Sequence, residues 1–221
     1  MKKLHLLSNA HLDPVWQWRW QEGVGAAITT FSAAADFCEE FENYIFCHNE
    51  AILYRWIEEN DPALFCRIQK LVAEGKWHIM GGWYLQPDCN MPSGESLIRQ
   101  IQTGLEYFRE KFPTFQKPEV AINFDSFGHT RGLVQILQDA GYRGYVCMRP
   151  ESADGDRNQI WKGFANSSVI VYRVFAAYNT LLGQVDKKLE PFLARFGDME
   201  EGLFLWGVGN HGGGPSRKDY Q

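Results

Sequence analysis

The sequence predicts an α/β fold in which helices cover a mostly parallel sheet. Short apolar runs of strand length alternate with longer segments of helical period, and polar residues follow several of the runs. This alternation is typical of β-α-β units, whose crossovers place successive strands parallel in one sheet. In such folds the reactive side chains gather at the carboxyl ends of the strands.

The first half of the chain contains three predicted strands and four predicted helices. The chain begins with a short apolar run, and the segment FSAAADFCEEF has the period and composition of a helix. The segment KWHIMGGW contains a strand, and Ser93 introduces a long amphipathic helix. The expected strands are residues 3–7, 44–47 and 77–80, and the expected helices are residues 28–41, 51–59, 62–74 and 96–112.

The second half continues the alternation and ends in a glycine-rich segment. The stretch IWKGFANSSVIVYRV predicts a β-hairpin that turns at Asn166, Ser167 and Ser168. Because a glycine-rich loop after a strand should lead into another covering helix, we expect residues 1–221 to be part of a larger domain. The expected strands are residues 119–124, 144–148 and 203–208, and the expected helices are residues 132–140 and 189–196.

Composition and charge indicate a folded globular protein. Of the 221 residues, 45% are apolar and 14% aromatic, and a net charge of −5 with scattered basic residues predicts no nucleic-acid partner. No run approaches the roughly 20 apolar residues of a membrane span, and no signal-peptide pattern is present. Five cysteines without a CxxC pair favour reduced thiols in a cytoplasm and argue against a thiolate zinc cluster. A homo-oligomer is compatible with the sequence.

The segment HLDPVW, just after the first strand, contains a candidate metal site. His11 and Asp13 are two residues apart, a spacing that suits an imidazole nitrogen and a carboxylate oxygen on one zinc ion. By itself the pair is more typical of a core histidine beside a capping aspartate than of a metal site. Asp125, in NFDSFGH directly after a strand, could be a third ligand, a nucleophile or a helix cap. Because all three are expected at the same edge of the sheet, the metal site is favoured.

Several other residues near strand ends are candidates for binding a substrate. Indole rings at or beyond strand ends (Trp16, Trp18, Trp20 and Trp83) suit stacking on the apolar face of a sugar, whereas Trp77, Trp161 and Trp206 are expected to be core. Asp88 and Arg149 follow strands, although such residues are commonly capping or solvated. The segment GVGNHGGGP lacks the Lys-Ser/Thr of a P-loop, and it is either a flexible loop or a backbone that approaches a ligand and presents Asn210 and His211 to it.

Four motifs in this order, HLDPVW, GGWYLQPDCNMPSGESLIRQ, NFDSFGH and GNHGGGP, resemble the amino-terminal catalytic domain of the glycoside hydrolase family 38 α-mannosidases, especially the bacterial branch. The resemblance extends from about His5 to the last residue. It implies a barrel-like (β/α) domain with mostly parallel strands and outer helices, which is the front part of a longer protein. It also implies a mannose-containing oligosaccharide or mannoside as the substrate.

The resemblance assigns roles to individual residues. His11 and Asp13 match the H-x-D ligands of one zinc ion, and Asp125 matches the aspartate that is both a zinc ligand and the catalytic nucleophile. Trp16 matches the tryptophan that stacks under the sugar. Phe127 and Arg149 fall where the family has an aromatic wall and an arginine close to the nucleophile.

The sequence departs from the family pattern in two respects. The remaining zinc histidine of the family comes from a segment further downstream, so we expect the fourth protein ligand outside this chain. The acid/base aspartate of the family lies in a loop comparable to residues 207–215, where this sequence has Asn210 and His211. The identity of the acid is therefore open.

The resemblance implies a zinc-dependent retaining mechanism with a covalent glycosyl-enzyme on Asp125. Within the family, a phosphorylated mannosyl-glycerate is an alternative substrate. A metal-dependent deacylase of sugars is an alternative from another class, because it would also use His and Asp on zinc but would form no covalent intermediate. A third alternative is that this chain alone is a non-catalytic sugar-binding fragment.

Overall fold

The computed structural model describes residues 2–150, 158–209 and 213–221, and the chain divides into two compact units. The first unit consists of Met1–His48, Leu53–His78 and Phe175–Gln221, and the second of Asn49–Ile52 and Ile79–Val174.

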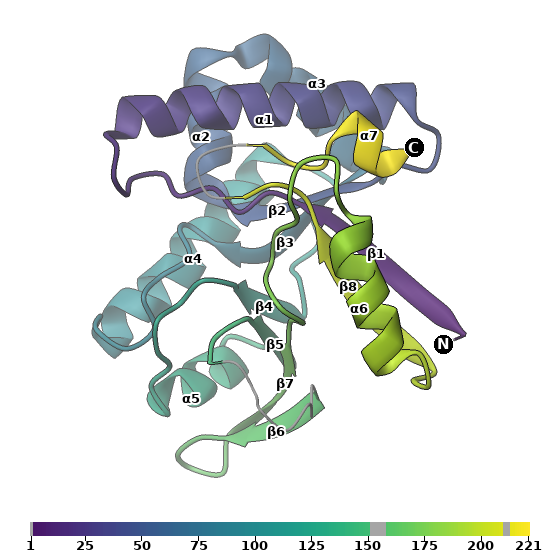
Figure 1. Ribbon diagram of the computed structural model, residues 1–221. Helices are drawn as coiled ribbons and strands as arrows, with labels where there is room; N and C mark the ends of the chain where they lie inside the picture. The colour runs from purple at the N-terminus through teal and green to yellow at the C-terminus, as the bar shows by residue number, and fades with distance from the viewer. Residues whose placement is uncertain (1, 151–157, 210–212) are drawn as a thin grey trace. The chain divides into compact units, whose positions relative to one another are not determined.

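The first unit is built around parallel strands with helices outside them (Figure 1). The strand order of its sheet is β3-β2-β1-β8, and β1 pairs in parallel with both β2 and β8. Its strands are β1 (Lys3–Asn9), β2 (Phe46–Glu50), β3 (Trp77–Trp83) and β8 (Glu201–Trp206), of which β2 and β3 continue into the second unit. Its helices are α1 (Trp20–Glu40), α2 (Ala51–Asn60), α3 (Pro62–Ala73), α6 (Asp186–Phe196) and α7 (Arg217–Tyr220), and the first two residues of α2 belong to the second unit.

Aromatic side chains from separate elements form the core of the first unit. Phe31 in α1 contacts Trp77 in β3 and Tyr54 in α2, with ring centroids 5.2 Å apart in both pairs. Indole Nε1 of Trp77 donates a hydrogen bond of 2.8 Å to the hydroxyl of Tyr54, so its buried polar group has a partner. The prediction that Trp77 belongs to the core is confirmed, because only 1% of it is exposed.

Helix α1 begins at Trp20, eight residues before the predicted start at residue 28. Two glycines, Gly23 and Gly25, lower the helical propensity of this first part. Gly23 is nevertheless required by packing, since a Cβ there would lie 2.1 Å from the carbonyl oxygen of Pro14. A close backbone contact thus explains a residue that the pattern alone treats as a helix breaker.

The second unit contains a sheet ordered β4-β5-β7-β6, in which only the β6–β7 pair is antiparallel. Hydroxyl Oγ of Ser93 caps the long helix by accepting from the amide of Ser96 at 3.2 Å. The elements of the second unit are α4 (Gly94–Lys111), β4 (Val120–Asn123), α5 (Gly132–Asp139), β5 (Gly144–Cys147), β6 (Asn158–Lys162) and β7 (Ser168–Arg173).

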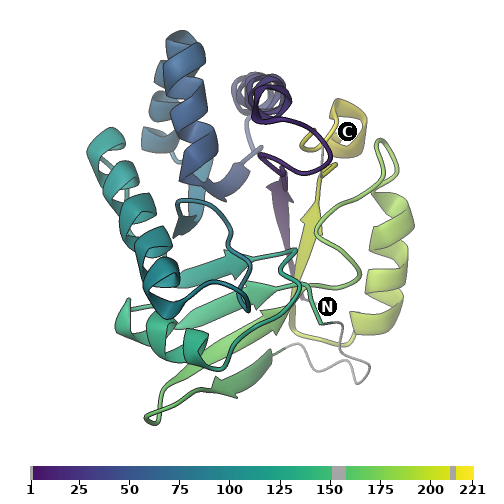
Figure 2. The same cartoon turned by 90° about the vertical axis from the view of Figure 1, so that its left-hand side faces the viewer.

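Helices α4 and α5 pack on one face of this sheet (Figure 2). Tyr145 and Cys147 of β5 lie in the resulting core, and both are buried. Trp83 is completely buried in the same core, so the prediction that it stacks on a sugar is wrong. Further members of the core are Leu97, Ile101, Leu105, Leu133, Val134, Leu137, Val169 and Val171.

The predicted β-hairpin is confirmed, but its turn lies earlier than expected. Strand β6 ends at Lys162 and β7 begins at Ser168, so the reversal occupies residues 163–167. Ala165 and Asn166 have φ values of 49° and 61°, in the left-handed region. The prediction placed the turn at the polar residues Asn166, Ser167 and Ser168, but Ser168 is already the first residue of β7.

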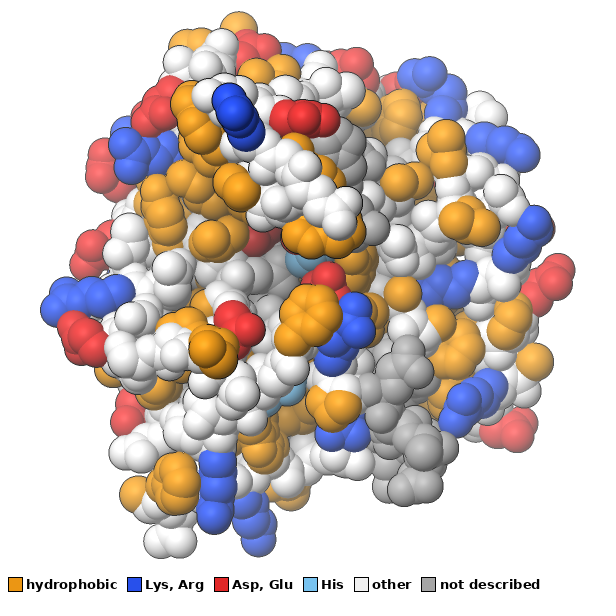
Figure 3. Space-filling model, turned by 60° about the vertical axis from the view of Figure 1, so that its left-hand side comes forward, with side chains coloured by type: hydrophobic (Ala, Val, Ile, Leu, Met, Phe, Trp, Pro, Cys, Tyr) orange, Lys and Arg blue, Asp and Glu red, His pale blue; other side chains and the backbone are white. Residues whose placement is uncertain are grey.

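The predicted α/β fold with mostly parallel strands and outer helices is confirmed within each unit. Helix α7 was not predicted, and β2 ends at Glu50, three residues after the predicted end at residue 47. On the face in Figure 3, Lys and Arg side chains are interspersed with Asp and Glu and form no basic patch. No helix in the described part of the chain is long and apolar enough to cross a membrane.

Candidate active site

Asp125 and Arg149 form an ion pair beyond the carboxyl ends of two adjacent parallel strands. Asp125 closely follows β4 and Arg149 closely follows β5, and the two strands pair in register from Val120 with Gly144 onward. Nε of Arg149 donates a hydrogen bond of 2.8 Å to Oδ1 of Asp125. The Asp125 side chain is 21% exposed and that of Arg149 is 43% exposed, so both groups are accessible to a ligand.

Phe127 contacts the guanidinium group of this pair. The Cζ atom of Arg149 lies 4.6 Å from the centroid of the Phe127 ring, a distance at which a cation is attracted to the ring face. Phe127 is 78% exposed, so its ring can contact a ligand as well as Arg149. The structure therefore brings together three residues that the sequence analysis named: Asp125, Phe127 and Arg149.

The loop after β3 forms hydrogen bonds with the carboxyl ends of β2 and β4, and Asp125 lies just beyond the end of β4. Oε1 of Gln86 accepts a hydrogen bond of 2.8 Å from the amide of Phe124, the residue before Asp125. The amide of Gln86 in turn donates to Oε1 of Glu50 at 3.1 Å. Nδ2 of Asn123 donates to the carbonyl oxygen of Pro87 at 2.7 Å. These hydrogen bonds hold the two residues that precede the candidate nucleophile, and sequence patterns do not reveal them.

The turn after Asp125 is held by side-chain hydrogen bonds. Oγ of Ser126 donates to the carbonyl oxygen of Gly128 at 2.9 Å and accepts from the amide of Cys89 at 3.3 Å. The amide of Thr130 donates to the carbonyl oxygen of Cys89 at 2.9 Å. Residues 126–130 are thus attached at both ends to the segment around Cys89.

His129 and Tyr145 are two residues of this region that the sequence analysis did not single out. Nε2 of His129 lies 2.7 Å from the carbonyl oxygen of Arg149, and its Nδ1 lies 3.1 Å from the hydroxyl of Tyr145. Burial lowers the pKa of His129, against the opposing effect of the hydrogen bond to Arg149. Burial raises the pKa of Tyr145 well above its usual value. His129 lies in the quoted motif NFDSFGH, which was the one available signal.

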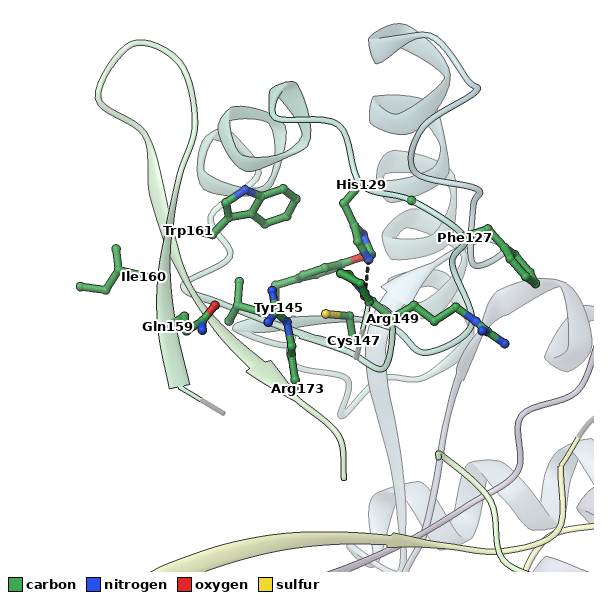
Figure 4. Close-up of a pocket in the computed structure, with 12 residues that line it drawn as sticks. Phe127, His129, Tyr145, Cys147, Arg149, Gln159, Ile160, Trp161 and Arg173 are labelled. Carbon is green, nitrogen blue, oxygen red and sulfur yellow. Dashed lines mark hydrogen bonds between the residues drawn. The ribbon is translucent and has the colours of Figure 1, made fainter. Parts of the chain in front are cut away.

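A cavity of about 690 Å³ adjoins these residues (Figure 4). Phe127, His129, Tyr145 and Arg149 line it together with Trp161 of the β6–β7 hairpin. Figure 4 shows the Arg149 side chain extending toward Phe127, and His129 between Tyr145 and the Arg149 backbone. Trp161 is part of the lining and is not fully buried, so the prediction that it is simply core is only partly correct.

In the first unit, His11 and Asp13 lie in the loop after β1. Nε2 of His11 is 3.3 Å from Oδ1 of Asp13, and the His11 ring contacts that of Tyr178 with centroids 4.3 Å apart. His11 is almost completely buried, whereas Asp13 is partly exposed. Indole Nε1 of Trp18 donates to the carbonyl oxygen of Asp13 at 3.1 Å, which secures the loop.

Trp16 is the exposed aromatic ring of the same loop. It is 59% exposed and makes an edge contact with Trp18, with ring centroids 5.5 Å apart. Trp20 is also largely exposed but belongs to the first turn of α1. An exposed indole beside the His11 and Asp13 loop agrees with the sugar-stacking role predicted for Trp16, which stays a prediction.

Asp88 has a local structural role in the second unit. Its Oδ1 accepts hydrogen bonds from the amides of Asn90 at 2.7 Å and Met91 at 2.9 Å, and these bonds lower the pKa of its carboxyl group. This is the capping geometry that the sequence analysis kept as an alternative. A role of Asp88 in substrate binding stays a prediction.

The glycine-rich segment begins with a close backbone contact. Gly207 has a φ of 132°, and a Cβ there would lie 2.0 Å from the carbonyl oxygen of Asn9. Packing against the end of β1 is therefore sufficient to require glycine at position 207, and the approach of this segment to a ligand stays a prediction. The predicted ligand-binding residues Asn210 and His211 lie outside the described residues.

Within neither unit do the described residues bring three His, Cys, Asp or Glu side chains together as a metal site. The predicted ligands are divided between the units, with His11 and Asp13 in the first and Asp125 in the second. The donor types of His11 and Asp13, an imidazole nitrogen beside a carboxylate oxygen, are those that zinc accepts.

The sequence matches the Glycosyl hydrolases family 38 N-terminal domain over residues 1–220. It is 26% identical to alpha-mannosidase 2C1 of Mus musculus over 224 residues, covering 97% of this chain and 21% of that protein. It is 28% identical to alpha-mannosidase G of Dictyostelium discoideum over 218 residues, covering 95% of this chain and 20% of that protein. The chain thus spans about a fifth of the length of the curated relatives it matches.

A solved structure has a similar fold. The crystal structure of an alpha-mannosidase from Enterococcus faecalis V583 matches with a TM-score of 0.80 at 19% sequence identity. The match covers 97% of this chain and 26% of that chain. At this identity the likeness is one of fold.

Proposed function

The chain belongs to glycosyl hydrolases family 38, and from this premise we propose that it is part of a zinc-dependent retaining α-mannosidase whose nucleophile is Asp125. The observation that carries the proposal is the ion pair between Asp125 and Arg149 at the ends of β4 and β5, with its 2.8 Å hydrogen bond. A carboxylate held in one orientation at the carboxyl end of a parallel sheet is suited to nucleophilic attack.

The proposed reaction has two displacements at one carbon. A carboxylate oxygen of Asp125 forms a bond to the anomeric carbon while the bond to the leaving oxygen breaks. The electron pair of that bond goes to the leaving oxygen, which takes a proton from an acid. Water then attacks the same carbon, the conjugate base accepts its proton, and Asp125 is released. Two inversions leave the product in the α configuration.

Arg149 prepares Asp125 for this attack. Its hydrogen bond fixes the orientation of the carboxylate before the substrate binds, so less reorganisation is needed in the transition state. Phe127 restricts the guanidinium by lying against it. The exposed face of Phe127 and the exposed indole of Trp16 would contact the apolar faces of sugar rings.

His11, Asp13 and Asp125 would hold the zinc ion, with a fourth protein ligand from outside this chain. The 3.3 Å approach of His11 Nε2 to Asp13 Oδ1 supports this ligand set, because two suitable donor atoms are already adjacent. When bound, zinc would supply Lewis-acid stabilisation of the sugar's neighbouring hydroxyls, which lie on the same side of the ring in mannose. Asn210, His211 and Asp88 remain candidates for contacting other hydroxyls of the substrate.

The substrate is proposed to be an α-linked mannoside or mannose-containing oligosaccharide. Family membership and similarity to proteins named alpha-mannosidases support this class. A phosphorylated mannosyl-glycerate remains the alternative within the family. A sugar deacylase remains the alternative outside it, and it requires no covalent attachment to Asp125.

Hydrolysis of 4-nitrophenyl α-mannoside by the full-length natural protein tests the proposal. The protein is dialysed against a chelator and titrated with zinc, beside an Asp125→Ala variant and an Asp139→Ala control at an exposed helix end. We expect zinc to restore release in the wild type and in the control but not in Asp125→Ala. Absence of release with any metal would refute the proposal, and acetate release from an acetylated sugar would favour the deacylase.

We also propose that the protein acts in the cytoplasm. All five cysteines lie in the described part of the chain, and all are free thiols. Four of them are buried, where reduced thiols pack as small apolar side chains. Localisation of a tagged full-length protein tests this; an extracellular pool would contradict it.

A further inference from the structure

We infer that His129 is a positioning residue that sets the place of Arg149 and, through it, the orientation of Asp125. This inference rests on the proposed function, because it assigns a role within that site. The observation is a chain of contacts inside the second unit, from Tyr145 to His129, to the backbone of Arg149 and to the carboxylate of Asp125.

The contacts determine which nitrogen of His129 has the proton. The carbonyl oxygen of Arg149 can only accept a hydrogen bond, so Nε2 of His129 must donate across the 2.7 Å distance. In the neutral ring Nδ1 then has no proton and accepts from the Tyr145 hydroxyl at 3.1 Å. Each ring nitrogen has one partner of the opposite kind, which fixes both the tautomer and the ring plane.

The far end of this chain of contacts is rigid. Tyr145 lies in the middle of β5, is 1% exposed and belongs to the core formed with α4 and α5. Its hydroxyl also lies 3.7 Å from Sγ of Cys89, which itself accepts from Nδ2 of Asn123 at 2.9 Å. His129 is therefore held against a packed strand, and it can transmit that position to the loop after β5.

The near end is the part that would otherwise move. Arg149 lies beyond the last residue of β5, and its side chain is 43% exposed. Its carbonyl oxygen is held by His129, while its Nε is held by Asp125 and its guanidinium lies against Phe127. Because His129 fixes the carbonyl group of Arg149, the backbone position of Arg149 is defined. Only the rotamer of its side chain then decides whether Nε donates to Asp125.

Two substitutions separate the two nitrogens of His129. In His129→Gln the side-chain amide can reach the position of Nε2 and donate to the Arg149 carbonyl. In His129→Asn the amide reaches only the position of Nδ1, so the contact to Arg149 is lost while a polar group remains beside Tyr145. His129→Gln thus removes only the contact to Tyr145, and His129→Asn removes only the contact to Arg149. Both variants keep a polar side chain at this position.

The experiment measures kcat and KM for 4-nitrophenyl α-mannoside with the zinc-loaded full-length protein. We expect His129→Asn to lower kcat by on the order of 10- to 100-fold, as a displacement near 1 Å does at a reacting centre. His129→Gln should retain more activity than His129→Asn. In an Arg149→Ala background, His129→Asn should have a much smaller effect, because the residue that His129 positions is gone.

A merely structural role gives a different pattern. If His129 only stabilises the fold, both variants should unfold at lower temperature but keep kcat per folded molecule, and the two substitutions should act additively with Arg149→Ala. Either result would overturn the inference.

A crystal structure of His129→Asn gives a readout independent of activity. We expect the distance from Arg149 Nε to Asp125 Oδ1, now 2.8 Å, to lengthen beyond hydrogen-bonding range. An unchanged distance would refute the inference. An inactive wild type would refute the proposed function instead, and the crystallographic distance would still decide the role of His129.

Discussion

Replacing Gly23 by alanine should displace the loop that contains His11, Asp13 and Trp16. A Cβ at Gly23 would lie 2.1 Å from the carbonyl oxygen of Pro14, which is in this loop. Real Cβ contacts essentially never fall below 3.0 Å, so the helix and the loop must separate by about 1 Å. Both atoms belong to the backbone or are fixed to it, so no side-chain rotation can relieve the contact.

The size of the effect follows from two opposing terms. Overpacking of a well-packed region costs about 1–3 kcal/mol, and a contact this short belongs at the upper end. Alanine gains about 1 kcal/mol over glycine inside a helix. We therefore expect Gly23→Ala to lower the free energy of unfolding by about 2 kcal/mol. A loop displacement of about 1 Å should also lower kcat by on the order of 100-fold.

Gly25→Ala is the matched control in the same helix. Nothing lies within 4 Å of a Cβ at Gly25, which is exposed, so only the gain in helix propensity remains. This variant should be more stable than the wild type by up to about 1 kcal/mol and fully active. Urea unfolding followed by tryptophan fluorescence, with kcat on 4-nitrophenyl α-mannoside, measures both effects. Equal stability of Gly23→Ala and Gly25→Ala would refute the packing argument.

Three further outcomes follow from the structure. Arg149→Lys should lower kcat/KM by about 10- to 100-fold, because lysine lacks the Nε donor of arginine. Arg143→Lys, at an exposed position, should leave kcat/KM unchanged. Equal kcat/KM values for the two variants would contradict the role of Arg149 in holding Asp125. Burial raises the pKa of Cys147 to about 11, so iodoacetamide near neutral pH should label exposed Cys66 quickly and Cys147 only after unfolding, as peptide mass spectrometry would reveal. Burial lowers the pKa of His48 to about 3, so the unfolded chain takes up a proton there that the folded chain does not. Unfolding of the chelator-treated protein should therefore cost about 2 kcal/mol less near pH 5 than near pH 7.5, and an H48N variant that keeps this slope would contradict the assignment.

The sequence predicted the strands and most helices because apolar periodicity is a local property. The order of elements from β1 to β8 is the predicted one, and most bounds differ by a few residues. The start of α1 was missed because Gly23 is selected by a tertiary contact with Pro14, which periodicity does not include. Trp83 was misjudged for a similar reason, since a strand end can be buried by helices that pack over it.

For the candidate site, the residues with reactive side chains were easier to predict than the residues that hold them in position. Asp125 and Arg149 were named because a polar residue after an apolar strand is visible in the sequence, and they do pair at 2.8 Å. The roles of His129, Tyr145 and Gln86 were not visible, because each depends on a hydrogen bond between segments far apart in sequence. Asp88 illustrates the reverse case, in which a candidate ligand-binding carboxylate is engaged by its own turn.

The most direct test of the account is chemical rescue of Asp125→Ala in the full-length protein. Azide is small enough to occupy the space of the missing carboxylate and would attack the anomeric carbon from the same side. The account predicts that azide restores release of 4-nitrophenol from an activated α-mannoside and that the product is β-mannosyl azide. If azide restores no activity and no mannosyl azide forms, while the wild type hydrolyses the mannoside, then Asp125 is not the nucleophile and the proposed mechanism is wrong.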